Sequence, residues 1–129
     1  MPHSVNNLTG EIIGSAIEVH RALGPGLLES AYRESLAREL FLRRIPIKQK
    51  WPVPFEYKGL ILKKSYEADL IVADTVVVET KSVEALHPIY EAQLLTYLRL
   101  GGWKAGLLIN FNEVVLKNGI RRRVLNFEE

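Results

Sequence analysis

The sequence contains no cysteine, and it contains a single methionine. The absence of cysteine excludes a disulfide framework, a thiolate zinc site and a thiol nucleophile. It also fits a protein of the cytoplasm, which is the location we expect. No apolar run approaches the ~18 residues of a membrane-spanning helix, and the first ten residues lack the apolar stretch of a signal peptide. No membrane partner is therefore expected.

An excess of charge of one sign is also lacking. Seventeen Lys and Arg oppose fifteen Asp and Glu, for a formal net charge of +2. This sum is a weak argument for a polyanionic partner, but the basic residues gather locally at Arg43-Arg44 with Lys48 and Lys50, at Lys63-Lys64, and at Arg121-Arg122-Arg123. Trp51 and Trp103 add aromatic surface that could stack on bases. Such clusters are most often solvated faces, so a nucleic-acid groove remains one of two interpretations.

The length and composition are those of one folded unit. The chain has 129 residues, of which 47% are hydrophobic and 25% charged, and it shows neither a repeat nor a linker. A chain of this size buries roughly two-thirds of the surface that its unfolded form exposes. We therefore expect a single domain over residues 1–129.

The spacing of apolar residues predicts helices first and strands later. The predicted helices are residues 8–23, capped by Asn7 or Thr9 and stopped by Gly24-Pro25-Gly26; residues 27–40; and residues 88–101. The predicted strands are residues 47–57, irregular or at an edge because of Pro52 and Pro54, then 60–72, 76–81, 104–110, and one or two within 114–127 around the Asn118-Gly119 turn. This order predicts an α/β fold with a mixed sheet flanked by helices.

Two carboxylates fall on one hairpin of this sheet. If residues 73–75 form a three-residue loop, Val72 pairs with Val76, and Asp69 lies opposite Glu79 on the same face. Lys81, two residues further on, shares that face. The sequence thus places two acids and an ammonium at the end of an otherwise apolar hairpin.

Opposed like charges in a sheet are destabilising, so something should offset the repulsion. A hard divalent cation such as Mg²⁺ would do so, because it prefers carboxylate oxygens and retains waters, one of which could attack a substrate while Lys81 orients it. The alternative is a solvated hairpin end in which Lys81 neutralises the acids. Residue types alone leave both interpretations open.

The same residues resemble the signature of the PD-(D/E)XK nuclease superfamily. Asp69 is followed ten residues later by Glu79-Thr80-Lys81. Ala68 stands where that signature usually has proline, a departure that many members tolerate. Residues 93–97 (QLLTY) are similar to the Q-x-x-x-Y of the branch related to the RecB nuclease, and residues 26–32 (GLLESAY) resemble the motif of the GxxExxY protein family.

The resemblance extends from about residue 14 to residue 124 and implies a restriction-endonuclease-like fold with an αβββαβ core, preceded here by an extra helix. It implies that Mg²⁺ or Mn²⁺ is bound by Asp69, Glu79, the main-chain carbonyl of Thr80 and Glu29, with Lys81 assisting the nucleophilic water. The implied reaction is hydrolysis of a nucleic-acid phosphodiester.

Two of these residues also have purely structural explanations. Glu29 could compensate the helix dipole and pair with Arg33 at i+4, although the resemblance favours a role at the metal. Gln93 lies between Ile89 and Tyr97 at four-residue steps, so its amide should face the sheet or the cleft. There it could act in catalysis by orienting Glu79, a metal-bound water or the nucleic acid, or it could bind the sheet backbone.

We therefore expect a metal-dependent nuclease, with DNA favoured over RNA as substrate. A nucleic-acid-binding or assembly module that no longer cuts is the alternative, and a purely structural interaction protein is a third class. A domain this short has little room for a recognition surface, which favours a homodimer.

Overall fold

Five strands form one mixed sheet in the computed structural model, which describes residues 4–125. Their spatial order is β1 (Ile47–Pro52), β4 (Glu67–Val72), β5 (Val76–Lys81), β6 (Ala105–Asn110) and β7 (Ile120–Val124). β5 and β6 run parallel, and the other neighbouring pairs are antiparallel. The parallel pair requires a crossover, which a helix supplies.

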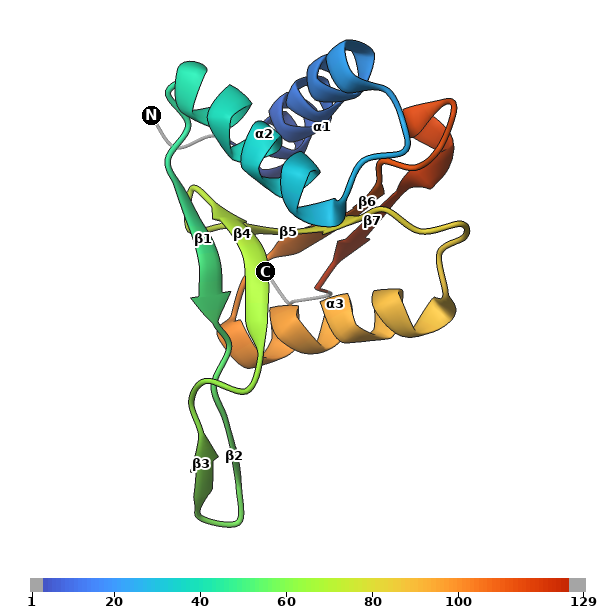
Figure 1. Ribbon diagram of the computed structural model, residues 1–129. Coiled ribbons are helices and arrows are strands. Elements are labelled where there is room, and N and C mark those ends of the chain that lie inside the picture. Colours follow the sequence, from blue (N-terminus) through green and yellow to red (C-terminus); the bar gives the residue numbers. More distant parts are fainter. Residues whose placement is uncertain (1–3, 126–129) are drawn as a thin grey trace.

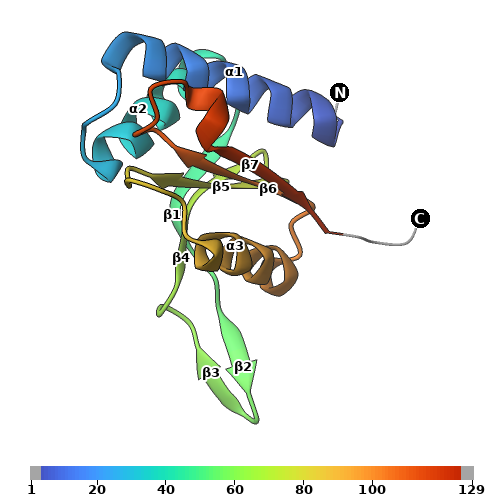
Figure 2. The same ribbon diagram turned by 90° about the vertical axis from the view of Figure 1, so that its right-hand side faces the viewer.

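Helices cover both faces of the sheet. α1 (Val5–Leu23) and α2 (Glu29–Leu42) lie on one face, and the crossover helix α3 (Pro88–Gly101) lies on the other (Figures 1 and 2). A short 3₁₀ helix, η1 (Leu116–Gly119), leads into β7. Within residues 4–125, no helix has the length and apolar character needed to cross a membrane.

The sheet separates two apolar cores because successive strand side chains point to opposite faces. In β5, Val76 and Val78 face α1 and α2, whereas Val77 packs towards α3. The core under α1 and α2 is the larger and includes Tyr32, which is fully buried. The core on the α3 side contains Leu94, Tyr97 and Leu98 from α3 and Leu108 from β6.

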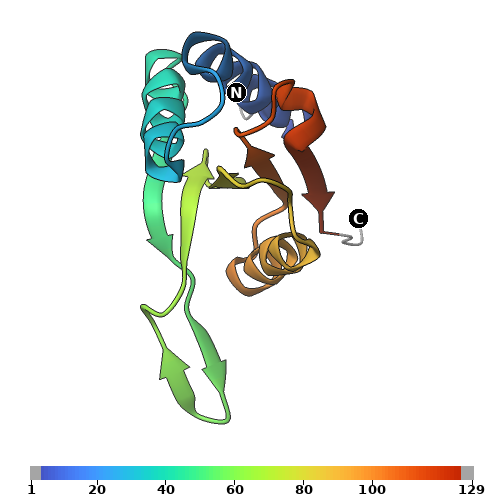
Figure 3. The same ribbon diagram turned by 45° about the vertical axis from the view of Figure 1, so that its right-hand side comes forward.

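A two-stranded hairpin projects from the body of the molecule between β1 and β4 (Figure 3). It consists of β2 (Phe55–Tyr57) and β3 (Leu60–Leu62), and its turn places Lys58 and Gly59 at positive φ (48° and 91°). The single strand predicted over 47–57 therefore breaks at Val53-Pro54, where a prolyl residue cannot donate to a ladder. The strand predicted over 60–72 breaks into β3 and β4. β1 lies at the sheet edge, as the two prolines indicated.

The start of α1 differs from the prediction. The helix begins at Val5, and Ser4 is its cap, since the Ser4 hydroxyl accepts a hydrogen bond from the Asn7 N–H at 3.0 Å. Asn7 and Thr9, predicted as caps, lie inside the helix, and the Thr9 hydroxyl bonds the Asn6 carbonyl. A serine three residues before the donor is an equally good cap, so the apolar spacing alone placed the boundary too late.

The carboxyl-terminal segment also differs in detail. Asn118 and Gly119 belong to η1 and not to a hairpin turn, and one strand, β7, follows. Residues 126 and 127, which the prediction included, lie outside the described part of the chain. The predicted α/β architecture, an αβββαβ core with an extra helix before it, is otherwise confirmed.

Candidate active site

The β4–β5 hairpin has the predicted register. Val72 pairs with Val76 and Leu70 with Val78, around a loop in which Ala73 and Asp74 adopt positive φ (50° and 52°). The ladder stops at Leu70 and Val78. Asp69 and Glu79 therefore lie just beyond the last paired residues, where the strand backbones no longer bond each other in the ladder.

The side chains of Asp69 and Glu79 connect the two strands at this point. Glu79 Oε2 accepts a hydrogen bond from the Asp69 N–H at 2.8 Å. Asp69 Oδ2 in turn accepts from the Thr80 N–H at 2.9 Å and from the Thr80 hydroxyl at 3.0 Å. The second oxygen of each carboxylate accepts no hydrogen bond from residues 4–125. Each acid is thus held by one oxygen, and the other is available to a ligand.

Burial makes this pair electrostatically unfavourable when both acids are charged. Glu79 is only 5% exposed, and burial together with the nearby Asp69 charge raises its pKa to about 8. The Asp69 N–H and the Lys81 ammonium oppose this rise without cancelling it. The pKa of Tyr97 is raised to about 12, first by burial and then by the Glu79 and Asp69 charges. A cation bound beside the Glu79 carboxylate would lower its pKa and favour the ionised form.

Glu29 reaches the same region from the first turn of α2. Burial raises its pKa, the Lys81 charge lowers it, and the Asp69 charge raises it. The predicted i+4 ion pair with Arg33 is not formed: the Arg33 guanidinium lies 3.5 Å from Glu34, and its Nε has no hydrogen-bond partner. The main charged neighbours of Glu29 are thus the residues at the end of the β4–β5 hairpin.

The loop before α2 is fixed by Tyr32. Its hydroxyl donates to the Gly24 carbonyl at 2.5 Å and accepts from the Leu27 N–H at 3.0 Å, while its ring stacks on Phe111 at 4.6 Å. The Ser82 hydroxyl, just after β5, donates to the Leu27 carbonyl at 2.6 Å. These contacts tie the start of α2 to the end of β5 and so place Glu29 beside the hairpin acids.

Lys81 lies at the end of β5, half-buried. Its Nζ is 4.4 Å from the centroid of the Tyr90 ring, a cation–π contact with α3. Through this contact the ammonium stays next to the two acids without forming an ion pair with either of them within residues 4–125. The lysine is therefore free to meet a negatively charged substrate.

The sequence model of the PD-(D/E)XK nuclease superfamily matches residues 6–123. The chain belongs to this superfamily. No curated protein and no solved structure gives a significant match. Membership supports nuclease activity on a nucleic-acid substrate, and the mixed sheet flanked by helices has the restriction-endonuclease-like form expected of a PD-(D/E)XK nuclease.

Only some of the predicted metal ligands of this PD-(D/E)XK chain contact one another directly. Asp69, Glu79 and Thr80 are linked directly by hydrogen bonds. Glu29 forms no hydrogen bond with them but interacts electrostatically with Asp69. Within residues 4–125, no three or more His, Cys, Asp or Glu side chains are arranged to hold a metal ion. The ligand set therefore stays a prediction.

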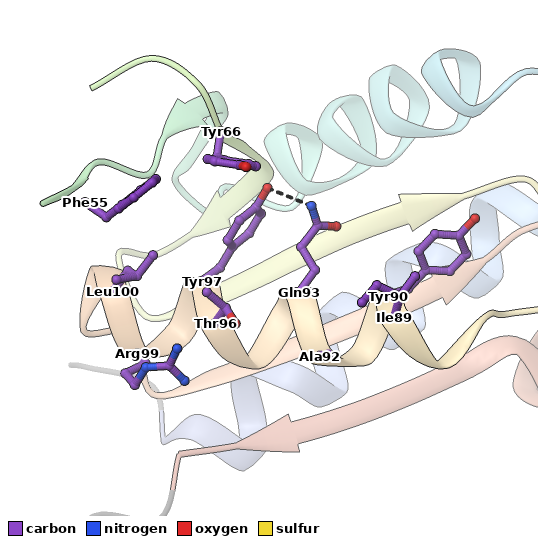
Figure 4. Close-up of a pocket in the computed structure, with 10 residues that line it drawn as sticks. All are labelled: Phe55, Tyr66, Ile89, Tyr90, Ala92, Gln93, Thr96, Tyr97, Arg99 and Leu100. Carbon is purple, nitrogen blue, oxygen red and sulfur yellow. Dashed lines mark hydrogen bonds between the residues drawn. The ribbon is translucent and has the colours of Figure 1, made fainter. Parts of the chain in front are cut away.

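Gln93 lies on α3, and its side chain is hydrogen-bonded to one residue of the same helix. Its Nε2 donates to the Tyr97 hydroxyl at 3.2 Å, and not to the sheet backbone (Figure 4). Gln93 and Tyr97 also line an open pocket of about 630 Å³ between α3 and the root of the β2–β3 hairpin. The role of Gln93 in catalysis stays a prediction, but its amide faces this pocket.

Two of the three predicted basic clusters are partly neutralised by acids of the described residues. Arg121 and Arg123 pair with Glu91, and Arg43 pairs with Glu39 and Glu11. Trp103 is not a free stacking surface, because it packs against the α3 core. Lys63 and Lys64, next to the projecting hairpin, form no ion pair with residues 4–125.

Sequence analysis did not identify Phe55, Tyr66 or Ser82. Tyr66 lies three residues before Asp69, which was a usable signal, whereas Phe55 joins it only because the β2–β3 hairpin folds back. Ser82 directly follows the signature lysine, but its partner Leu27 is 55 residues away.

Proposed function

We propose that this chain is a metal-dependent nuclease that hydrolyses phosphodiester bonds, with DNA favoured over RNA, and that residues 1–129 form one nuclease domain. The observation that supports it best is the pair of side-chain hydrogen bonds that cross the end of the β4–β5 hairpin, in which Glu79 accepts from the Asp69 N–H and Asp69 accepts from the Thr80 N–H. A buried carboxylate such as Glu79 beside a half-buried one such as Asp69 is unfavourable on its own and becomes favourable around a cation.

The residues present suit a hard divalent cation. Asp69, Glu79, the Thr80 main-chain carbonyl and Glu29 would supply oxygen ligands, which Mg²⁺ and Mn²⁺ prefer. The unbonded oxygen of each hairpin acid supports this assignment. When bound, the cation would neutralise negative charge and lower the pKa of a coordinated water.

The protein groups around the acids have distinct tasks in this proposal. Lys81 would orient the attacking water and stabilise the negative charge that develops on the phosphoryl oxygens, since its ammonium has no protein counter-ion among the described residues. Gln93 would orient substrate or water with its amide oxygen, because its NH₂ group is already bonded to Tyr97.

We also infer that the chain belongs to the GxxExxY family and to the RecB-related branch of the superfamily. In support, Gly26 adopts a φ of 103°, Glu29 starts α2, and Tyr32 fixes the loop that joins them. Each named position of the motif therefore serves to place the Glu29 carboxylate.

Metal binding tests the proposal most directly. Calorimetric titration with Mg²⁺ and with Mn²⁺ should give binding to the parent chain that Asp69→Asn greatly weakens. Asp74→Asn is the matched control, because Asp74 is an exposed acid on the same hairpin, paired with Lys48. Equal loss in both variants would contradict an assigned metal site.

Cleavage is then measured with labelled single- and double-stranded DNA and RNA in the presence of the metal. The proposal expects cleavage that Asp69→Asn, Glu79→Gln and Lys81→Met each reduce by at least a hundredfold. Metal-independent binding of nucleic acid without cleavage would favour the non-cutting module instead. Sedimentation at increasing concentration tests the expected homodimer.

A further inference from the structure

The pocket beside the acids is lined mainly by aromatic and aliphatic side chains. Phe55 and Tyr66 contribute rings from the base of the projecting hairpin, 5.9 Å apart between centroids and tilted by 46°. Tyr97, Ile89 and Leu100 contribute from α3. Figure 4 shows Tyr97 and Gln93 pointing from α3 towards Tyr66. An apolar hollow of this size falls within the range of about 300–1,000 Å³ that is usual for small organic ligands.

This pocket adjoins the site of the acids through two of its lining residues, Tyr90 and Tyr97. Tyr90, which also lines it, carries the Lys81 ammonium over its ring. The negative charges of Glu79 and Asp69 both act on the Tyr97 hydroxyl and raise its pKa. Tyr66 is three residues from Asp69 along the chain, a separation that spans at most ~11 Å between Cα atoms. A group held in the pocket is therefore about one or two nucleotides from a phosphate placed at the acids.

We propose that the pocket binds an unpaired nucleobase of the substrate strand, so that this nuclease acts on single-stranded or frayed nucleic acid. The inference rests on the proposed function, since it assumes that the substrate strand runs past Asp69 and Glu79. Flat aromatic walls fit the face of a base, which is exposed only when the base has left a duplex stack. The base would lie between the rings of Phe55 and Tyr66 and the side chains of α3.

Polar groups in and near the pocket fit the same occupant. The Gln93 amide oxygen accepts no hydrogen bond from residues 4–125 and can accept one from a base amino group. The hairpin that carries Phe55 bears Lys58, and Lys63 and Lys64 follow its second strand. Against these three lysines stand two acids, Glu56 and Glu67, and Arg99 lines the pocket from α3, so the charge around the pocket is positive on balance and suits a phosphate backbone.

The experiment measures binding of fluorescently labelled 12-nucleotide DNA and RNA by anisotropy, with Mg²⁺, in an Asp69→Asn background that prevents cleavage. We expect the single strand to bind at least tenfold more tightly than a blunt duplex of the same sequence. Tyr66→Ala and Phe55→Ala should each weaken single-strand binding about 5- to 100-fold, as the loss of one stacked base predicts. Tyr66→Phe should bind like the Asp69→Asn parent.

The matched control is Tyr57→Ala on the same hairpin, because Tyr57 is an exposed aromatic residue that does not line the pocket. Tyr66→Leu, which keeps apolar volume but removes the ring, guards against misfolding of the alanine variants. An abasic site moved along the strand should weaken binding at one position. The proposal is overturned if the duplex binds equally well, if Tyr57→Ala and Tyr66→Ala act alike, or if AMP or dTMP alone binds as tightly as the strand.

This outcome is separable from that of the nuclease proposal. Failure of the parent chain to cleave any substrate would count against the proposed function but leave the binding comparison intact. Cleavage of duplex DNA with unchanged rates in Tyr66→Leu would support the nuclease and reject the base pocket.

Discussion

The Tyr32 hydroxyl closes the loop between α1 and α2 by donating to the Gly24 carbonyl eight residues earlier in the chain. The same hydroxyl accepts from the Leu27 N–H, and Ser82 holds Leu27 from the end of β5. The tyrosine of the G-x-x-E-x-x-Y segment is therefore a positioning residue. It sets the start of α2, and with it the Glu29 carboxylate, against the hairpin that carries Asp69 and Glu79.

Tyr32→Phe should separate this positioning from packing. The phenyl ring keeps its stack on Phe111, whereas both hydrogen bonds are lost. We expect the free energy of unfolding to fall by about 1–3 kcal/mol in urea titrations. Mg²⁺ affinity should fall by a factor similar to that caused by Glu29→Gln. Tyr57→Phe, at an exposed ring, is the control, and an unchanged Mg²⁺ affinity in Tyr32→Phe would show that the loop does not position Glu29.

Gly26→Ala tests the other end of the same segment. Gly26 has a φ of 103°, a conformation that alanine adopts only with strain, so unfolding should become easier by about 1–2 kcal/mol. Gly10→Ala is the opposite case, because Gly10 lies inside α1 with open space around an added Cβ. It should stabilise the chain by about 0.5–1 kcal/mol. Equal effects of the two substitutions in denaturant unfolding would contradict the assigned loop geometry.

The register of the β4–β5 hairpin could be predicted because a three-residue loop over residues 73–75 pairs Val72 with Val76, and the remaining pairs follow by counting outward along both strands. The spacing of apolar residues also predicted the three helices. It did not fix the start of α1, because Ser4, Asn7 and Thr9 are all suitable cap residues and lie within about one turn of each other. The Lys58-Gly59 turn, flanked by short apolar runs, is a hairpin signal that the strand assignment overlooked. The pocket could not be predicted, because Phe55 and Tyr66 meet α3 only through the crossover that carries the chain from β5 to β6.

The lysines beside the projecting hairpin give a salt-dependent prediction. Lys63 and Lys64 have no ion-pair partner among the described residues, so each can contact a phosphate. Lys63→Ala and Lys64→Ala should weaken nucleic-acid binding regardless of sequence, and each should make the plot of log affinity against log salt shallower by about one unit. Lys117→Ala, on η1 at the far end of the molecule, should leave the slope unchanged (Figure 1). A slope equal in all three variants would exclude phosphate contacts at the hairpin.

Glu79 makes the stability of the metal-free protein depend on pH. Its pKa is about 8 in the folded chain and near 4.5 when unfolded, so the folded state holds the proton more tightly. The stabilisation is complete below pH 4.5 and is lost as pH rises through 8. Thermal unfolding in EDTA should therefore show Tm falling between pH 5 and 8, as the free energy of unfolding decreases by an amount on the order of a few kcal/mol.

The variant Glu79→Gln, which cannot ionise, should flatten this pH dependence, whereas Glu84→Gln, at an exposed acid, should preserve it. Saturating Mg²⁺ should restore the lost stability in the parent and not in Glu79→Gln, because the cation takes the place of the proton on the buried carboxylate.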